Sequence, residues 1–169
     1  ELAIEYKELI IGFDIAGPEL NYLPSMYRDS FLKVKNEGIN ITIHAGEGDG
    51  VHSIQEALDN GAKRIGHGVR IIEDISDDNE LGPTADHILQ NNIPLEVCIT
   101  SNLHTNMYKN PQDHPISRLH NLGFNISLNT DNRLMSNTSI DNELNVAKAA
   151  GIENPTYLLK YSASDSFLN

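Results

Sequence analysis

The chain has 169 residues, of which 39% are hydrophobic and 21% are charged, a composition typical of a folded globular protein rather than a disordered one. Its 12 Lys and Arg residues against 24 Asp and Glu residues give a net charge of −12, which argues against nucleic acid or an anionic membrane surface as a general partner. No apolar run approaches the ~20 residues that a membrane-spanning helix needs, and no signal-like N-terminus is visible. The single cysteine, Cys98, excludes an internal disulfide, so we expect a cytoplasmic protein.

Short β-rich runs recur along the chain, roughly 25 to 30 residues apart, as expected of repeated βα units. The runs cover residues 8–17, 38–47, 62–68, 93–98 and 124–131. Between them lie stretches with helical spacing of apolar residues, such as Ile54, Ala57 and Leu58. Most of the runs follow a helix-stop signal, at residues 36–38, 60–61, 91–92 and 121–123. This pattern predicts an α/β fold with a parallel sheet.

The last run has one apolar and one polar face, because Phe124, Ile126 and Leu128 alternate with asparagine and serine. Such a strand suits the wall of a barrel with helices outside and a polar interior, whereas strands of an open doubly wound sheet are apolar on both faces. Five strands do not close a (β/α)8 barrel of about 250 residues. Either the sheet is smaller and open, or three strands precede Glu1. We favour the second reading: residues 1–169 form the C-terminal portion, about five βα units, of one TIM barrel.

Polar and ionisable residues gather where the predicted strands end. His44 and Glu47 follow the second strand, His67 ends the third, Asp131 ends the fifth, and Gly17 ends the first. Ligands of parallel α/β folds bind at the carboxyl ends of the strands. Imidazoles and carboxylates at that rim suit a metal such as zinc or acid–base chemistry, and we interpret the glycines of residues 46–50 as clearing space for a ligand.

Each of these residues also has a plain structural reading. A single histidine is more often a hydrogen-bonded structural residue than a ligand, Glu47 could be solvated, and Asp131 could cap the following segment. Four coincidences at strand ends favour a site. The remaining histidines show no such placement, and we interpret them as surface or helix residues: His52, His87, His104, His114 and His120.

The motifs at these strand ends resemble, in order, those of the adenosine deaminase family of metal-dependent TIM-barrel hydrolases. The matching stretches are FDIAG (13–17), HAGEG (44–48), RIGHGV (64–69), LEVCITSN (95–102), SLNTDN (127–132) and SASDSFL (162–168). HAGE, GHG and NTD are specific as an ordered set and weak singly. The resemblance runs the length of the chain and implies zinc-dependent hydrolytic deamination of adenosine and 2′-deoxyadenosine.

The resemblance assigns a role to five residues. His44 and Asp131 would be zinc ligands. Glu47 would protonate the purine ring nitrogen beside the carbon under attack, and His67 would orient and stabilise the attacking hydroxide. Gly17 would contact the substrate through its backbone, where a side chain would block it.

Two departures from the family pattern matter. The family has a second aspartate after its ligand aspartate, which donates a hydrogen bond to N7 of the purine, and this chain has Asn132 there. An amide donates at any pH, so we expect Asn132 to keep this substrate contact. The family also takes two zinc ligands from a His-x-His pair on its first strand, and this chain has none. We therefore expect an incomplete, inactive chain that associates with the missing N-terminal half of the barrel or with another copy.

Other functions remain open at this point. The related deaminases of adenosine monophosphate or adenine share HAGE and GHG, although this acidic chain offers no basic cluster for a phosphate. Cytidine-type deaminases need a Pro-Cys-x-x-Cys ligand pair, which a single cysteine excludes. From another class, a half-barrel could be non-catalytic and only bind a partner.

Overall fold

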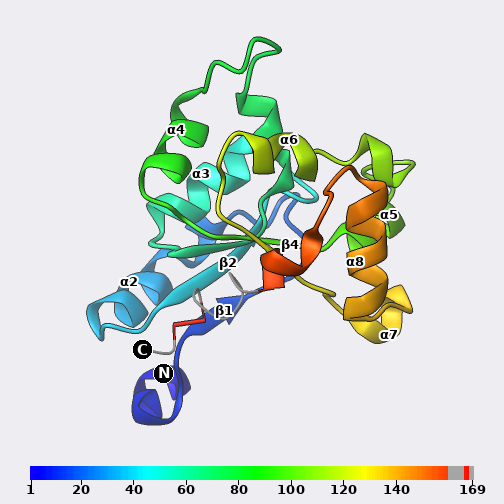
Figure 1. Ribbon diagram of the computed structural model, residues 1–169. Coiled ribbons are helices and arrows are strands. Elements are labelled where there is room, and N and C mark those ends of the chain that lie inside the picture. Colours follow the sequence, from blue (N-terminus) through cyan, green and yellow to red (C-terminus); the bar gives the residue numbers. More distant parts are fainter. Residues whose placement is uncertain (160–165, 168–169) are drawn as a thin grey trace.

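The computed structural model describes residues 1–159 and 166–167 (Figure 1). Most of the SASDSFL motif lies outside these residues. The strands are β1 (Phe13–Ile15), β2 (Ile41–Ala45), β3 (Arg64–His67), β4 (Leu95–Val97) and β5 (Ile126–Leu128). The α-helices are α1 (Leu2–Glu5), α2 (Arg28–Asn36), α3 (Val51–Asp59), α4 (Pro83–Gln90), α5 (Ile99–His104), α6 (Ile116–Asn121), α7 (Arg133–Ser136) and α8 (Ile140–Ala149). None of the helices in the described part of the chain is long and apolar enough to cross a membrane.

The five strands form one parallel sheet in the order β1-β2-β3-β4-β5, and each predicted run contains one of them. Parallel crossovers are almost always right-handed, so strands added in chain order place their helices on the same face. Helices α2 and α3 accordingly pack on β2, and α4 packs beside α3 (Figure 1). A doubly wound sheet would reverse its strand order at a switch point. The predicted α/β fold with barrel-type winding is confirmed.

The two faces of the sheet differ in polarity, as the alternation in the sequence predicts. The face toward the helices is buried and apolar and includes Ile41, Ile43, Ile65, Leu95, Val97, Ile126 and Leu128. On the other face, Arg64 Nε lies 3.1 Å from Thr42 Oγ1 and 3.2 Å from Glu96 Oε1. Polar side chains of three adjacent strands thus bond across the inner face, while apolar burial holds the helices to the outer face.

The predicted helix stops also lie where the backbone turns into the next strand. Gly38, Gly61, Asn92 and Gly123 have positive φ angles of 74°, 92°, 50° and 90°. Residues in this left-handed conformation end helices because they satisfy the last carbonyl groups, and glycine adopts it without strain from a Cβ atom. Each strand after β1 therefore starts at a defined point, which sets the register that brings the strand ends together.

Candidate active site

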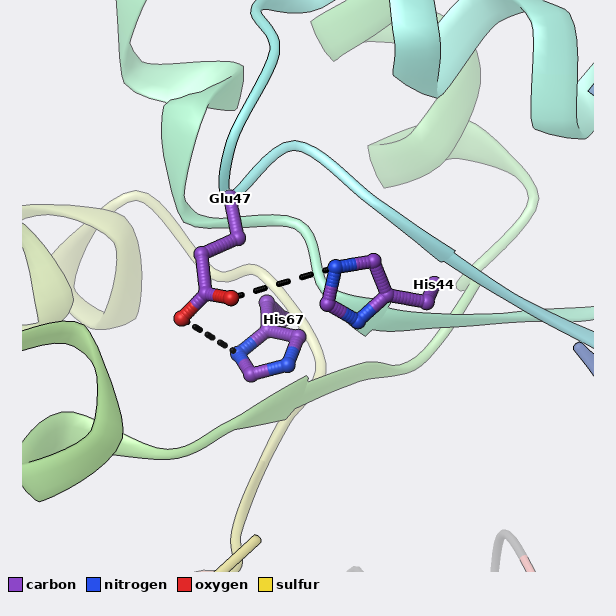
Figure 2. Close-up of side chains that lie close together, drawn as sticks. All are labelled: His44, Glu47 and His67. Carbon is purple, nitrogen blue, oxygen red and sulfur yellow. Dashed lines mark ion pairs between the residues drawn. The ribbon is translucent and has the colours of Figure 1, made fainter. Parts of the chain in front are cut away.

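Three ionisable side chains, those of His44, Glu47 and His67, meet at the carboxyl ends of β2 and β3 (Figure 2). The carboxylate of Glu47 lies between the two imidazoles, with Oε2 3.8 Å from His44 Nε2 and Oε1 3.5 Å from His67 Nδ1. The ring centroids are 4.6 Å apart, and the rings meet edge to face at 74°. One ligand atom from each residue lies within 4.8 Å of the other two. Two imidazoles and a carboxylate are a donor set that suits Zn²⁺.

The backbone around this cluster is held in a tight, left-handed geometry. Ala45 and His67 are register partners at the ends of β2 and β3, and His67 has a φ of 63°. A Cβ atom at Gly46 would lie 2.5 Å from Ile54 Cδ1, and one at Gly68 would lie 2.7 Å from a methyl carbon of a β4 side chain. The interpretation that glycine clears space for a ligand is therefore wrong at Gly46, where protein atoms fill that space. A non-glycine residue at positive φ is strained, and such strain is concentrated at functional sites.

Glu19, which the sequence reasoning missed, organises the loop that carries Glu47. Its buried carboxylate accepts backbone N–H groups from residues 46, 47, 48 and 49 at 2.8, 2.8, 2.7 and 3.1 Å. It also accepts the hydroxyl of Ser53 at 2.8 Å and lies 3.1 Å from His44 Nε2. Glu19 follows β1 by four residues, so the rule that singled out Glu47, an acid just after a strand end, applies to it as well. Glu19 thus links the ends of β1 and β2.

These contacts shift the pKa values of the ionisable groups in opposite directions. Burial would raise the pKa of Glu19, but the hydrogen bonds from His44, Ser53 and the loop amides outweigh burial and lower it to about 2. Burial would likewise lower the pKa of His44, but its hydrogen bond with Glu19 and the nearby carboxylates outweigh burial and raise it. Burial lowers the pKa of His67, and the charge of Glu47 opposes this change. The arrangement favours a neutral His67 beside a carboxylate-bound His44.

Asp131 lies at the end of β5 and lines the same cavity, of about 230 Å³, as His44 and His67. Its φ of 55° turns the chain out of the strand, and its Oδ2 accepts the hydroxyl of Ser101 at 2.7 Å. The negative charge of Asp131 is a smaller contribution that favours the protonated form of both histidines. It adds to the raised pKa of His44 and opposes the burial that lowers the pKa of His67. Asp131 therefore faces the same cavity as the histidines but is outside the tight cluster of three.

Asn132 is exposed and forms the N-cap of α7, where its Oδ1 accepts the backbone N–H of Met135 at 3.1 Å. The capping role considered for Asp131 thus belongs to its neighbour. An asparagine side chain has a donor NH₂ group as well as an acceptor oxygen, so the cap leaves the donor available.

Gly17 follows β1 and lines a second cavity, of about 110 Å³, together with His44, Tyr22 and Tyr27. Its φ is 144°, which disfavours any side chain, and a Cβ atom there would meet no heavy atom within 4 Å. At this glycine, unlike Gly46, the structure does have open space beside the backbone. A ligand could approach the Gly17 backbone from this side.

Asn102 and His114 form a buried hydrogen-bond network behind the cluster. The side chain of Asn102 is fully buried on α5, and its Nδ2 lies 2.6 Å from Glu47 Oε1 and 3.2 Å from His67 Nδ1. Its Oδ1 lies 3.1 Å from His114 Nε2. The prediction of a surface or helix position was wrong for His114. This residue is only 3% exposed and belongs to the segment of the chain between α5 and α6. No sequence signal marked His114, whereas Asn102 ends the LEVCITSN motif after β4.

The other four histidines lie in helices, as predicted. His52, His87, His104 and His120 belong to α3, α4, α5 and α6. The first three are exposed. They take no part in the cluster.

Comparisons with known proteins identify the family and the fold of the chain. The family model for adenosine deaminase matches residues 1–157. Adenosine deaminase 1 of Streptomyces coelicolor is 47% identical over 149 residues, which cover 85% of this chain and 38% of that protein. The adenosine deaminase of Mycolicibacterium vanbaalenii is 44% identical over 150 residues, covering 85% of this chain and 41% of that protein. The chain thus spans about two-fifths of the length of these curated relatives.

Three solved structures with the same fold match 99% of this chain, and each match covers about half of the other protein's chain. An adenine deaminase from Arthrobacter aurescens superposes with a TM-score of 0.84 at 23% sequence identity, and the match covers 53% of the deaminase chain. The N6-methyl-AMP deaminase from Arabidopsis thaliana superposes with a TM-score of 0.81 at 26% sequence identity, and the match covers 48% of its chain. A zinc-bound amidohydrolase from Burkholderia ambifaria superposes with a TM-score of 0.83 at 16% sequence identity, and the match covers 48% of its chain. On the match of its family model and the agreement in fold, the chain belongs to the adenosine deaminase family.

Proposed function

We propose that this chain is the C-terminal part of a zinc-dependent adenosine deaminase. The complete barrel would hydrolyse adenosine and 2′-deoxyadenosine to the inosine nucleosides and ammonia, as part of purine nucleoside metabolism. One observation carries this proposal: the cluster of His44, Glu47 and His67 lies at the strand ends of a chain whose curated relatives are adenosine deaminases.

His44 and Asp131 would contribute ligands to the zinc ion. They suit it because an imidazole and a carboxylate face one cavity. Zinc lowers the pKa of water and so supplies a nucleophile at neutral pH. The remaining ligands would come from strands outside this chain, since its sequence has no His-x-His pair.

The other cluster residues would handle protons and orientation. Glu47, in its protonated form, would donate a proton to the purine ring nitrogen beside the carbon under attack, which prevents negative charge from building up on the ring. His67, kept neutral by burial, would orient the attacking water. The exocyclic nitrogen would then leave as ammonia. Gly17 would meet the base through its backbone, and the NH₂ group of Asn132 would donate to N7.

A nucleoside fits the chain better than a nucleotide. Arg70 lies in a hollow beside Glu47, where it could in principle meet a phosphate. Its guanidinium is instead held by Glu73, with Nε 2.5 Å and a terminal nitrogen 3.1 Å from the two carboxylate oxygens. A phosphate would have to displace this carboxylate. Deamination of adenosine monophosphate is therefore the weaker alternative, although one structural neighbour is named an N6-methyl-AMP deaminase. Free adenine has no phosphate, so Arg70 does not bear on it, and deamination of adenine stays an alternative that the name of another neighbour shares.

The open edges of the sheet suggest what completes the site. Among the described strands, β1 and β5 each have one neighbour. Large apolar side chains are exposed in the segments that adjoin these two strands in the sequence. Leu9, before β1, is 80% exposed, and Leu134 and Met135, in α7 after β5, are 88% and 78% exposed. Exposed strand edges and apolar patches favour association. We propose that the remaining strands of the barrel cover them, and that in their absence a second copy does. A purely binding half-barrel is the alternative.

A chimera tests the proposal, with the N-terminal part of the Streptomyces coelicolor relative placed before Glu1. We expect zinc binding and adenosine turnover from the chimera, and neither from the 169-residue chain. Glu47→Gln should lower turnover by about 10²- to 10⁴-fold because it removes the general acid, while zinc content is kept. The matched control is Glu153→Gln at an exposed position, which should change neither the turnover nor the zinc content.

Stable one-to-one zinc binding and turnover by the chain alone would refute the claim that ligands are missing. Faster turnover of adenine or adenosine monophosphate by the chimera would refute the choice of substrate.

A further inference from the structure

The buried network behind the cluster has a defined hydrogen-bond direction. Its starting point is the backbone N–H of Ile116, which donates to His114 Nδ1 at 3.2 Å. A backbone N–H is only a donor, so Nδ1 must carry a lone pair. Burial lowers the pKa of His114 to about 3, which keeps this ring neutral. The proton of His114 therefore lies on Nε2.

This proton determines the orientation of the Asn102 amide. His114 Nε2–H donates to Asn102 Oδ1 across 3.1 Å, which turns the NH₂ group toward Glu47 and His67. In the opposite orientation, the NH₂ group would face the Nε2–H donor, and Oδ1 would face the carboxylate of Glu47. Because Asn102 is fully buried, water cannot relieve either mismatch, and each unsatisfied group would cost about 1 to 3 kcal/mol.

The two hydrogens of the NH₂ group then act on two different site residues. One is directed to Glu47 Oε1 at 2.6 Å, so an acid proton on Glu47 must lie on Oε2. The other is directed to His67 Nδ1 at 3.2 Å, so a neutral His67 must carry its proton on Nε2. We propose that Asn102, anchored by His114, is a positioning residue that selects both the protonated oxygen of Glu47 and the tautomer of His67.

The inference rests on the proposed function only for the use made of these protons. A general acid works when its proton lies on the oxygen that faces the substrate, and an imidazole that orients water needs a defined donor or acceptor nitrogen. The directions of the hydrogen bonds themselves follow from Ile116, His114 and Asn102, and they exist without zinc or substrate.

Nitrogen-15 NMR of the histidine rings in the 169-residue chain, without zinc or substrate, measures the tautomers directly. We expect His67 and His114 each as a single Nε2–H tautomer in the unchanged chain. Two substitutions test the anchor. His114→Leu removes the donor and should give His67 a mixture of tautomers, whereas His114→Gln retains an N–H donor and should restore the Nε2–H form. Asn102→Asp, which cannot donate when ionised, should also release the tautomer of His67.

The matched control is Asn60→Asp. Asn60 is also buried, and its side chain donates to the carbonyl oxygen of Glu56 at 2.8 Å, at the end of α3. This variant should lose comparable stability and leave the His67 spectrum unchanged. An Nδ1–H form of His67 in the unchanged chain, or an unchanged tautomer in both His114→Leu and Asn102→Asp, would overturn the inference. The first of these results needs no variant to fold. If the tautomers are as expected but the chimera does not deaminate adenosine, the proposed function is wrong and the inference about Asn102 remains supported.

Discussion

Replacing Glu19 by glutamine tests how strongly this residue holds the loop that carries Glu47. The carboxylate has two oxygens, and each accepts two backbone N–H groups: those of residues 47 and 48 on Oε1, and those of residues 46 and 49 on Oε2. Glutamine keeps one oxygen and places an NH₂ group where the other was. Whichever way the amide turns, two backbone donors lose their acceptor and meet another donor.

Two ways of expressing the energy of these hydrogen bonds give similar costs. A buried donor without an acceptor costs about 1 to 3 kcal/mol, so two of them cost about 2 to 6 kcal/mol. The pKa of Glu19 falls from 4.5 to about 2 in the folded chain, and this difference corresponds to about 3 kcal/mol of stability. We expect Glu19→Gln to lower the free energy of unfolding at pH 7 by about 3 kcal/mol. The raised pKa of His44 reflects the same pair and adds no separate energy.

Urea unfolding followed by circular dichroism measures this change. With a typical urea dependence of about 1 to 3 kcal/mol per molar, the midpoint should fall by about 1 M or more. The contribution of a carboxylate with a lowered pKa is present above its unfolded pKa and disappears as pH falls through its folded pKa. The difference between wild type and variant should therefore shrink as pH falls from 4.5 toward 2. Glu153→Gln, at an exposed position, is the control and should stay within about 0.5 kcal/mol. A loss below about 1 kcal/mol at pH 7, or one independent of pH, would show that Glu19 does not hold the loop.

Three further predictions concern the loop, the cap and the open edge. Gly46→Ala should destabilise the chain by about 2 to 5 kcal/mol in urea unfolding, since a left-handed alanine and a clash with a buried side chain add together. Gly38→Ala has the same positive φ but no neighbour within 4 Å, so it should cost only about 1 to 2 kcal/mol, and equal losses would contradict the clash. In the chimera, Asn132→Ala should raise the KM for adenosine more than it lowers kcat, and Asn132→Asp should retain the cap of α7; loss of zinc from Asn132→Ala would show that the ligand set is wrong. Sedimentation velocity should show that the 169-residue chain self-associates and that Leu134→Lys reduces this self-association. A monomeric wild-type chain would contradict the proposal that the exposed apolar residues near β5 promote association.

Much of the fold was accessible from local sequence patterns. The alternation of apolar and polar residues in 124–131 predicted a strand with one polar face, and in β5 the polar Ser127 lies between the apolar Ile126 and Leu128. The stop signals at Gly38, Gly61 and Gly123 predicted where helices end, because few residues other than glycine adopt a left-handed backbone readily. Strand ends are local features, and parallel strands collect their carboxyl ends at one edge, so His44, Glu47 and His67 could be expected to meet.

The hydrogen-bond partners of these residues were decided only by the tertiary structure. Glu19 and Gly46 are 27 positions apart, and Asn102 and Glu47 are 55 apart, so no local pattern connects them. Gly46 and Gly17 look alike in the sequence, yet one faces a packed side chain and the other faces open space. His114 was predicted to be a surface or helix residue because its contact with the Asn102 side chain of α5 leaves no local pattern in the sequence. Local sequence determines where a strand or helix begins and ends, whereas burial and hydrogen-bond direction depend on which distant segments pack together.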